Sequence, residues 1–390
     1  MGATEAVISV RIKKAVIIDG MRSGTSELSL RIRDEARRLG FFKTGITPIR
    51  PLPDGERLEA WLRKGMHGEM GYLERQAPRR LDPRLVFQDA RSLLVVAMSY
   101  HTEHVPLFAP LNGRISRYAW GDDYHAIVKN RLERLLDFIR KEEPAAEGRC
   151  YVDTGPVMEK AWGAQTALGW MGKHTNLIAR GHGSWFFVGV ILLNLDLECD
   201  GPERDYCGKC RRCMEACPTG AIIAPYVLDA RLCISYLTIE LRGAIPVSLR
   251  PLIGNRIYGC DDCQDVCPWN RFAVATAEDR FYPRQERLMP DLLGLVHLSP
   301  AEFKRKYQGS PILRSTRDGF VRNVVVALGN SGNREAIPAL KAALQDASPL
   351  VRSHAEWALE RFGAGKAAEE KRIENADPLE TRIRNPKGTI

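Results

Sequence analysis

The stretch "CGKCRRCMEACP" (207–218) places four cysteines at the spacing C-x2-C-x2-C-x3-C, and a proline follows the last of them. This spacing is the bacterial ferredoxin pattern, in which three close thiolates bind one 4Fe–4S cluster and the fourth cysteine binds the neighbouring cluster. A ferredoxin-like domain with two 4Fe–4S clusters is therefore expected near the middle of the 390-residue chain.

A second group of cysteines, "CDDCQDVCP" (260–268), repeats the pattern but lacks its first cysteine. Cys233, which lies upstream, can supply the missing thiolate, and the segment 234–259 is expected to form extra structure beside the second cluster. The crossed pattern then gives two ligand sets. The first set is Cys207, Cys210, Cys213 and Cys267, and the second set is Cys217, Cys233, Cys260 and Cys263.

Zinc is the alternative, because paired C-x2-C units also build zinc ribbons. A zinc site does not explain, however, why both cysteine groups end in C-x3-C-P. A disulfide framework fits poorly, since eight of the ten cysteines lie between Cys207 and Cys267 in a chain with no secretory signal. Two adjacent clusters transfer single electrons in sequence, so a further redox centre is expected at one end of the pair.

The composition is that of a soluble globular protein with two or three domains, at 44% hydrophobic and 27% charged residues. The longest apolar run, "WFFVGVILL" (185–193), is far shorter than the roughly 20 residues of a membrane helix. We therefore expect a cytoplasmic protein with no membrane partner. The net charge of +9 indicates either a polyanionic partner or a solvated basic surface.

The first 200 residues have an α/β pattern. The apolar runs 92–100 and 184–195 predict buried strands, and 125–141 predicts a helix with a basic outer face. The segment 151–178 predicts a strand, a turn and then a helix rich in small residues. Asp153 falls where this strand ends, a common position for a reactive group, although a turn or helix-cap aspartate is the alternative.

Familiar cofactor and catalytic motifs are missing from this part of the sequence. There is no G-x-G-x-x-G, and "GWMGKHT" (169–175) lacks the spacing of a phosphate loop. The Asp-Thr-Gly at Asp153 occurs once, whereas aspartic protease chemistry needs two such carboxylates.

The C-terminal region contains a weak repeat. The segments 321–332 and 351–363 resemble each other, and 336–350 supplies a helix between them, which is typical of HEAT-like helical repeats. The arginines of this region either tie adjacent repeats together or form a basic face for nucleic acid. The candidates for such a face are Arg314, Arg317, Arg322 and Arg352.

Taken together, these segments resemble the epoxyqueuosine reductases from about residue 26 to 365. The resemblance depends on several motifs that a ferredoxin does not share. They are "RYAWGDDYH" (117–125), "VDTGPVMEKAWG" (152–163), "GWMGKHTNLI" (169–178), "DARLCISYLTIE" (229–240), "GCDDCQDVCPWN" (259–270) and "RNVVVALGNSG" (322–332), beside the first cysteine group.

The resemblance implies a fold and a reaction. An α/β (α+β) domain would bind cobalamin in its base-off form and would be followed by the two-cluster domain and HEAT-like repeats. The enzyme would remove the epoxide oxygen from epoxyqueuosine at the wobble position of a tRNA anticodon, leaving the alkene of queuosine. Electrons would come from a flavodoxin-like or ferredoxin-like protein. Asp153 matches the proton donor of the family, and burial beside the cofactor is expected to raise its pKa.

The resemblance also implies a cofactor environment and a division of the chain. The matching cofactor positions are Ser116, His125, Asp153, Lys173, Thr175, Asn176 and Ser235, and His174 departs from an expected Asn. The expected parts are 1–198 for the cobalamin domain, 199–285 for the clusters, 286–375 for the repeats and 376–390 for a flexible tail. A monomer is expected.

Two other functions explain part of the sequence. A ferredoxin-type electron-transfer protein fused to helical repeats would leave the first 200 residues without a role. A dehalogenase-like cobalamin enzyme acting on a small molecule would not need the basic repeats.

Overall fold

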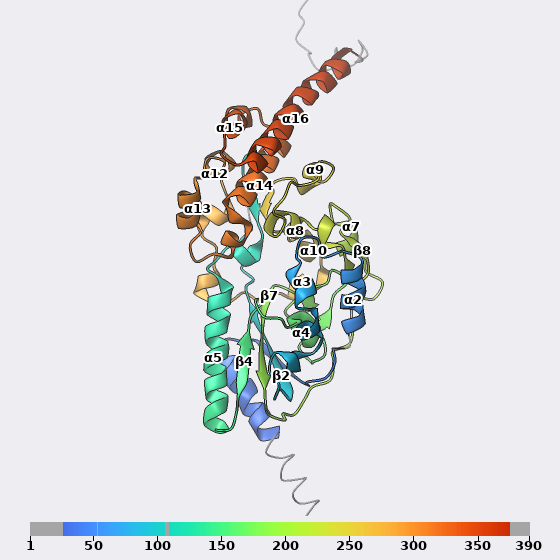
Figure 1. Ribbon diagram of the computed structural model, residues 1–390, viewed down its shortest axis with the longest axis vertical. Coiled ribbons are helices and arrows are strands. Elements are labelled where there is room, and N and C mark those ends of the chain that lie inside the picture. Colours follow the sequence, from blue (N-terminus) through green and yellow to red (C-terminus); the bar gives the residue numbers. More distant parts are fainter. Residues whose placement is uncertain (1–25, 53, 106–108, 375–390) are drawn as a thin grey trace, which may run out of the picture.

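The computed structural model describes residues 26–52, 54–105 and 109–374, with side chains up to residue 363. The molecule is elongated, with a small sheet and its helices in one half and the C-terminal helices in the other (Figure 1). Within the described ranges, no helix has the length and apolar character needed to cross a membrane. The tail expected at 376–390 lies outside the described residues.

The sheet of the N-terminal half has four strands in the order β1-β2-β7-β4, and every neighbouring pair is antiparallel. These strands are β1 (Lys43–Pro48), β2 (Ser92–Ser99), β7 (Phe186–Leu193) and β4 (Gly148–Tyr151). The two central strands are apolar almost throughout and are buried, because helices and loops cover both faces of the sheet. The strands predicted at 92–100 and 184–195 are confirmed, and their pairing makes this half α+β.

One face of the sheet is covered by α5 (Tyr124–Glu142), which confirms the helix predicted at 125–141. Asp123 caps its N-terminus, since the carboxylate accepts a hydrogen bond from the backbone N–H of His125 at 3.0 Å. The opposite face is covered by the loop that follows β4 and by α6 (Glu159–Gly163). The small-residue helix expected here is therefore only five residues long. The chain then turns into a hairpin of β5 (Trp170–Met171) and β6 (Leu177–Ile178).

The cysteine-rich region is built of short elements. The first cysteine group contains α7 (Arg212–Glu215) and is followed by β8 (Ile222–Ala224) and β9 (Val227–Leu228), and the second contains α10 (Asp262–Asp265). The segment between the groups forms the extra structure that was expected. Its elements are α8 (Ile234–Ile239), α9 (Arg250–Ile253) and β10 (Arg256–Tyr258).

The C-terminal half consists of helices that share a hydrophobic core with α8 and β10. Its principal elements are α12 (Leu292–Leu295), α13 (Pro300–Lys306), α14 (Thr316–Asn330), α15 (Ala336–Ala343) and α16 (Pro349–Glu374). Gly329 lets α14 and α16 approach closely, because a Cβ at this position would lie 2.7 Å from the Cβ of Ala358. Helices at the expected positions confirm the all-α character of this half.

β10 also links the two halves. It pairs in parallel with β3 (Arg114–Ile115), and the N–H of Ser116 donates to the carbonyl of Tyr258 at 2.8 Å. The second cysteine group, which follows β10 directly, is thereby held against the N-terminal half.

Candidate active site

Asp153 occupies a strained turn just after β4. Its φ of 58° lies in the left-handed region, which non-glycine residues seldom adopt. The N–H of Thr154 donates to the carbonyl of Val152 at 2.6 Å, which closes a three-residue turn around Asp153. Gly155 is required next, because a Cβ there would lie 2.3 Å from the ring of Tyr151. The Asp-Thr-Gly sequence therefore forms a tight turn that projects the Asp153 carboxylate away from the sheet.

Two side chains from the start of α5 contact this carboxylate. The hydroxyl of Tyr124 donates to Oδ2 of Asp153 at 2.6 Å, and Nε2 of His125 lies 3.7 Å from the same oxygen. On its other side, Nδ1 of His125 lies 2.6 Å from Oδ1 of Asp123. The ring of Tyr124 is fixed by stacking on Phe187 of β7, with centroids 4.1 Å apart. The result is a chain of carboxylate, imidazole and carboxylate that ends at Asp153.

These contacts determine where the proton resides. Burial alone would raise the pKa of Asp153, but the nearby His125 imidazole and the hydrogen bond from Tyr124 outweigh it and hold the pKa at about 2. Burial would lower the pKa of His125, and the hydrogen bonds to Asp123 and Asp153 instead raise it to about 9. Burial thus acts in the expected direction but is outweighed here, and the expectation for a carboxyl buried beside the cofactor stays a prediction. At neutral pH the pair is an aspartate and an imidazolium.

Asp153 faces a cavity of ≈ 420 Å³ between the sheet and the second cysteine group. Its side chain is 69% exposed because it opens into this cavity, while the surrounding protein still limits its hydration. Glu159 and Lys160 of α6 line the cavity beside it. Burial and the negative charge of Asp153 raise the pKa of Glu159 to about 8. Burial lowers the pKa of Lys160, whose Nζ donates to Oδ1 of Asn176 at 2.6 Å.

Two buried polar atoms on the cavity wall have no hydrogen-bond partner: Oε1 of Glu159 and Nε2 of His174. Burial lowers the pKa of His174 to about 4, so this imidazole is neutral. Unsatisfied polar atoms beside a cavity are what a bound polar group would satisfy. The wall therefore fits a cofactor with both apolar and polar surface.

The residues predicted for the cofactor are only partly brought together. Five of them line the cavity: Ser116, Asp153, Thr175, Asn176 and Ser235. His125 lies behind Asp153, as described above. Lys173 is directed elsewhere, because its Nζ donates to the carbonyls of Gly208 at 2.6 Å and Cys210 at 2.9 Å. Lys173 thus holds the loop of the first cysteine group, and its role toward the cofactor stays a prediction.

The cysteines face one another in two sets. Cys217, Cys233, Cys260 and Cys263 line the same cavity as Asp153. Burial raises the pKa of Cys267 to about 11, with further upward contributions from the other thiols of its own set. Those thiols are Cys207, Cys213 and Cys210. These are the sets that the crossed assignment requires, and the assignment itself stays a prediction.

Local backbone also suits thiolate ligands. Burial raises the pKa of Cys233 most strongly, but the backbone N–H groups of Ser235 and Tyr236 donate to its sulfur and lower the pKa. Cys233 directly precedes α8, so these donors belong to the first turn of that helix. Within the described part of the chain, no three His, Cys, Asp or Glu side chains converge as the ligands of a single metal ion would.

The four arginines proposed for tRNA have different environments. Arg322 is 0% exposed, and its guanidinium donates to the carbonyls of Leu237, Leu241 and Gly243. A phosphate cannot reach it, so its tRNA role is corrected: Arg322 ties α14 to α8 and to the segment that follows α8. These partners lie between the two cysteine groups, so the contact does not join adjacent repeats.

Two more of these arginines have internal partners. Arg317 forms two hydrogen bonds with the carboxylate of Asp346, at 2.7 and 2.6 Å, and its side chain is only 13% exposed. Arg352 donates to the carbonyls of Asp346 and Ala347 at 2.7 and 2.9 Å. Arg314 is 53% exposed, pairs with Glu240 at 2.8 Å and lies 5.8 Å from the ring centroid of Tyr72. Arg314 is therefore the most accessible member of the group.

Three family models match parts of the chain. The 4Fe-4S double cluster binding domain matches residues 206–270, the domain described as "Epoxyqueuosine reductase QueG, DUF1730" matches 80–154, and HEAT repeats match 311–386. The epoxyqueuosine reductase of Xanthomonas campestris is 44% identical over 348 residues, which are 88% of this chain and 98% of that protein. The chain belongs to the epoxyqueuosine reductase family. The Escherichia coli enzyme is 40% identical, covering 86% of this chain and 89% of its own length.

Solved structures of epoxyqueuosine reductases have the same fold. One, crystallised with an epoxyqueuosine-modified stem loop of tyrosine tRNA, matches with a TM-score of 0.82 at 30% identity, covering 92% of this chain and 96% of its own. The Bacillus subtilis enzyme, with its catalytic aspartate loop swung out of the active site, matches with a TM-score of 0.80 at 29% identity and the same coverage. The family resemblance and the double-cluster region expected from the sequence are confirmed.

Proposed function

We propose that this chain reduces epoxyqueuosine to queuosine in tRNA, at the wobble position of the anticodon. The epoxide takes up two electrons and two protons, and the products are an alkene and water. The observation that supports this most strongly is the Asp153 turn, which opens into a cavity that Cys217, Cys233, Cys260 and Cys263 also line. An acid and an electron source thus face the same space.

Base-off cobalamin is the proposed occupant of this cavity. Its polar edges would meet Ser116, Thr175, Asn176 and Ser235. The unsatisfied Nε2 of His174 offers an additional polar contact. When bound there, the cofactor would supply electrons to a carbon of the epoxide.

Asp153 is proposed to deliver the proton to the epoxide oxygen. An epoxide oxygen leaves poorly as an alkoxide, so a positioned acid contributes to the rate. Because the surrounding groups lower the Asp153 pKa and raise that of His125 to about 9, the imidazolium of His125 is the proposed source of this proton. Asp123 holds His125 in place and keeps it protonated, and the hydroxyl of Tyr124 fixes the carboxylate.

The strained turn at Asp153 is proposed to move during the catalytic cycle. Strained backbone is often concentrated at functional sites, where it favours two alternative arrangements. The relative from Bacillus subtilis has its catalytic aspartate loop swung out of the active site. A corresponding movement here would admit the modified base and then bring Asp153 back to the epoxide.

Arg314 is proposed to bind tRNA backbone near the mouth of the cavity. It is exposed, and its charge acts on Asp153, which places the two residues in the same region. A tRNA substrate also gives the net charge of +9 a use, since basic surface attracts phosphate. The relative crystallised with a tRNA stem loop supports this class of substrate.

We also propose that the chain acts as a monomer in the cytoplasm and is divided near residues 198, 285 and 375. The rival function, reduction of a small molecule, is tested by anaerobic incubation of the reconstituted protein with epoxyqueuosine-containing tRNA. Nucleoside mass spectrometry should then show queuosine. Reduction of the free epoxynucleoside as readily as the tRNA would favour the small-molecule alternative.

A further inference from the structure

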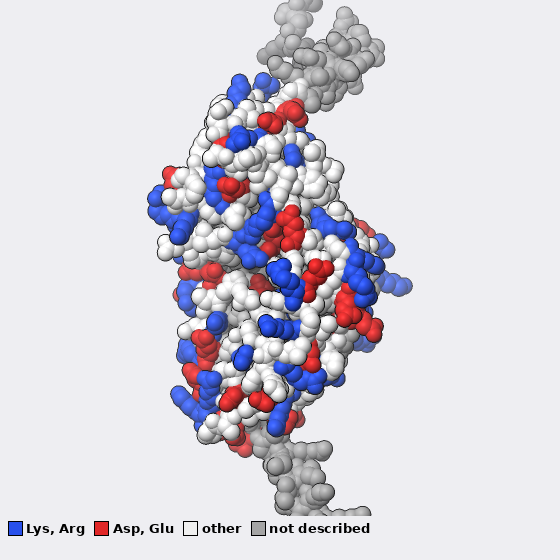
Figure 2. Space-filling model, viewed as in Figure 1, with Lys and Arg blue, Asp and Glu red and all other residues white. Residues whose placement is uncertain are grey.

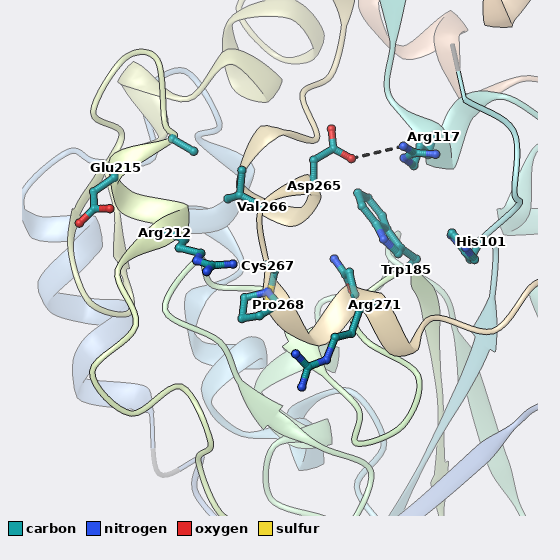
Figure 3. Close-up of a pocket in the computed structure, with 12 residues that line it drawn as sticks. His101, Arg117, Trp185, Arg212, Glu215, Asp265, Val266, Cys267, Pro268 and Arg271 are labelled. Atoms are coloured by element: carbon teal, nitrogen blue, oxygen red, sulfur yellow. Dashed lines mark hydrogen bonds and ion pairs between the residues drawn. The ribbon is translucent and has the colours of Figure 1, made fainter.

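A second pocket, of ≈ 880 Å³, lies on the outer side of the first cysteine set. Figure 3 shows Cys267 and Pro268 in its wall, flanked in this view by the guanidinium groups of Arg212 and Arg271. Trp185, His101 and Arg117 line its other side. Cys267 is thus the member of the first set that lines this pocket, whereas the second set lines the cavity of Asp153.

This arrangement gives the two cysteine sets different exposure to an outside electron source. With both clusters bound, an electron delivered at the outer pocket would enter at the cluster of the first set and pass to that of the second, which lies beside the cavity of Asp153. The surface beside Cys267 is therefore the expected entry point for electrons.

The charges beside Cys267 are mostly positive and uncompensated. Arg211, Arg212 and Lys209 are exposed on the first cysteine loop, and Arg271 follows the second. Among the residues that the structure describes, none of these four has a salt-bridge partner. Of the two carboxylates that line the pocket, Asp265 is paired with Arg117 at 3.4 Å, which leaves Glu215 to oppose the cations. Asp205, just before the first cysteine group, is also exposed and accepts hydrogen bonds from the N–H of Cys207 and the hydroxyl of Tyr226. Figure 2 shows Lys and Arg atoms gathered over the region that Figure 1 labels α7.

An exposed apolar patch adjoins these cations. Phe272 and Val274 are 41% and 51% exposed, and the guanidinium of Arg271 lies 4.5 Å from the ring centroid of Phe272. Phe272 in turn contacts Trp269, which packs in the small hydrophobic cluster around Cys267. An apolar centre with a charged rim is typical of protein–protein interfaces, and the rim charges select a partner of opposite sign.

We propose that this face, formed by Lys209, Arg211, Arg212, Arg271, Phe272 and Val274, is the docking site of an acidic one-electron carrier protein of the flavodoxin or ferredoxin class. The carrier loses one electron, the first cluster gains it, and two such transfers supply the two-electron reduction. The inference rests on the proposed function only in taking the reduction of epoxyqueuosine as the reaction that uses these electrons. Nucleic acid is the other polyanion that could bind here, but its reacting base must reach the cavity of Asp153, which the second cysteine set lines.

The test uses anaerobic, cluster-loaded protein and a purified acidic flavodoxin in its hydroquinone state. Arg271→Glu and the double variant Arg212→Glu/Arg271→Glu are compared with Arg305→Glu, which alters an exposed arginine of α13. Stopped-flow bleaching of the cluster absorbance gives the rate of reduction. Binding of oxidised flavodoxin is measured separately by titration, and dithionite replaces the protein donor as a control.

We expect the double variant to bleach about 10- to 100-fold more slowly with flavodoxin at low salt, since electrostatic steering contributes factors of this size. Arg271→Glu, which lies outside both cysteine groups, should show a smaller loss with full iron content. Arg305→Glu and dithionite reduction should stay unchanged. Bleaching at the wild-type rate in both variants would overturn the proposal. So would a loss of tRNA affinity with normal flavodoxin reduction, which would make the face a nucleic-acid site. None of these measurements requires epoxyqueuosine. A protein that is reduced normally but does not convert epoxyqueuosine would therefore count only against the proposed function.

Discussion

Oδ2 of Asp153 accepts a hydrogen bond from the hydroxyl of Tyr124 at 2.6 Å, and the same oxygen lies 3.7 Å from Nε2 of His125. The carboxylate at the head of the cavity is thus stabilised in its charged form, and the available proton is stored on the imidazole. In the proposed mechanism the pair delivers the proton together, so the pH dependence of the reaction is expected to follow His125.

Turnover should fall as the pH rises through about 9, because His125 then loses its proton. The variant His125→Gln has no imidazole, so the fall in rate at alkaline pH (the alkaline limb of the pH profile) should disappear. The reaction should also be slower by about 10²-fold or more, the usual contribution of acid–base catalysis. The pH profile of kcat/KM with tRNA substrate measures both effects. His297→Gln, an exposed histidine, is the control. An alkaline limb that survives unchanged in His125→Gln would assign the proton store to another group, with Glu159 the next candidate.

The same pairing contributes to stability with a defined sign. The folded pKa of His125 is raised from 6.5, so its stabilising contribution is complete below about pH 6.5 and is lost as the pH rises through about 9. The pKa of Asp153 is lowered from 3.8, so its contribution is present above that value and is lost as the pH falls through about 2.

Cys217→Ala should damage the cluster that faces the cavity and leave the other cluster intact. The reason is that Cys217 lines the cavity with Cys233, Cys260 and Cys263, although it belongs by sequence to the first cysteine group. Iron analysis and electron paramagnetic resonance of anaerobic protein measure the outcome. Cys150→Ala, outside both sets, should keep all eight irons expected for two 4Fe–4S clusters. Selective loss of the outer cluster in Cys217→Ala would refute the crossed assignment.

Lys173→Met should weaken the first cluster. It removes two hydrogen bonds to the carbonyls of Gly208 and Cys210 and a positive charge beside the thiolates. We expect slower cluster assembly, faster loss in air and a lower reduction potential, measured by redox titration. Lys209→Met changes an exposed lysine of the same loop and should retain normal iron content. If Lys173→Met instead loses only cobalamin affinity, the family-based expectation for this residue is right.

Arg314→Gln should weaken tRNA binding and reduce its salt dependence by about one phosphate contact. Arg305→Gln on α13 is the matched control. Binding measured across a series of salt concentrations distinguishes a phosphate contact from a general loss of charge.

Arg322→Met provides the contrast within the same group of arginines. It leaves three backbone carbonyls without their donor, so the free energy of unfolding should fall by about 2–4 kcal/mol. The salt dependence of tRNA binding should stay that of wild type. A reduced salt slope in Arg322→Met, or an unchanged one in Arg314→Gln, would contradict this division of roles.

Local patterns were sufficient for part of the fold. The strands near 92–100 and 184–195 and the helix 125–141 could be predicted because apolar runs and helical periodicity depend on neighbouring residues alone. The antiparallel pairing could not, since strand direction depends on how distant segments connect. The helix expected after Gly155 is short because the chain turns early into the β5–β6 hairpin, which its small residues do not indicate.

The candidate site, like the fold, could be predicted only in part from the sequence. Cysteine spacing predicts the clusters directly, and the position of Asp153 at the end of a strand marked it as a candidate. Its lowered pKa depends on Tyr124 and His125, which come from another element, so burial alone does not predict the net shift. Glu159, Lys160 and Asp261 were missed, because nothing in their local sequence separates them from ordinary charged residues. Asp261 is buried and accepts hydrogen bonds from Ser116 and the N–H of Arg117, which fixes the second cysteine group against the cavity.

Single-turnover conversion of epoxyqueuosine-containing tRNA by anaerobic, fully loaded protein tests the central claim most directly, with wild type and Asp153→Asn compared by nucleoside mass spectrometry. Asp153→Asn retains the shape of the side chain but cannot carry a carboxylic proton. We predict that wild type forms queuosine and that the variant, with both clusters, cobalamin and tRNA bound, is slower by about 100-fold or more. Wild-type rates in Asp153→Asn, or no queuosine from wild type, would contradict the account.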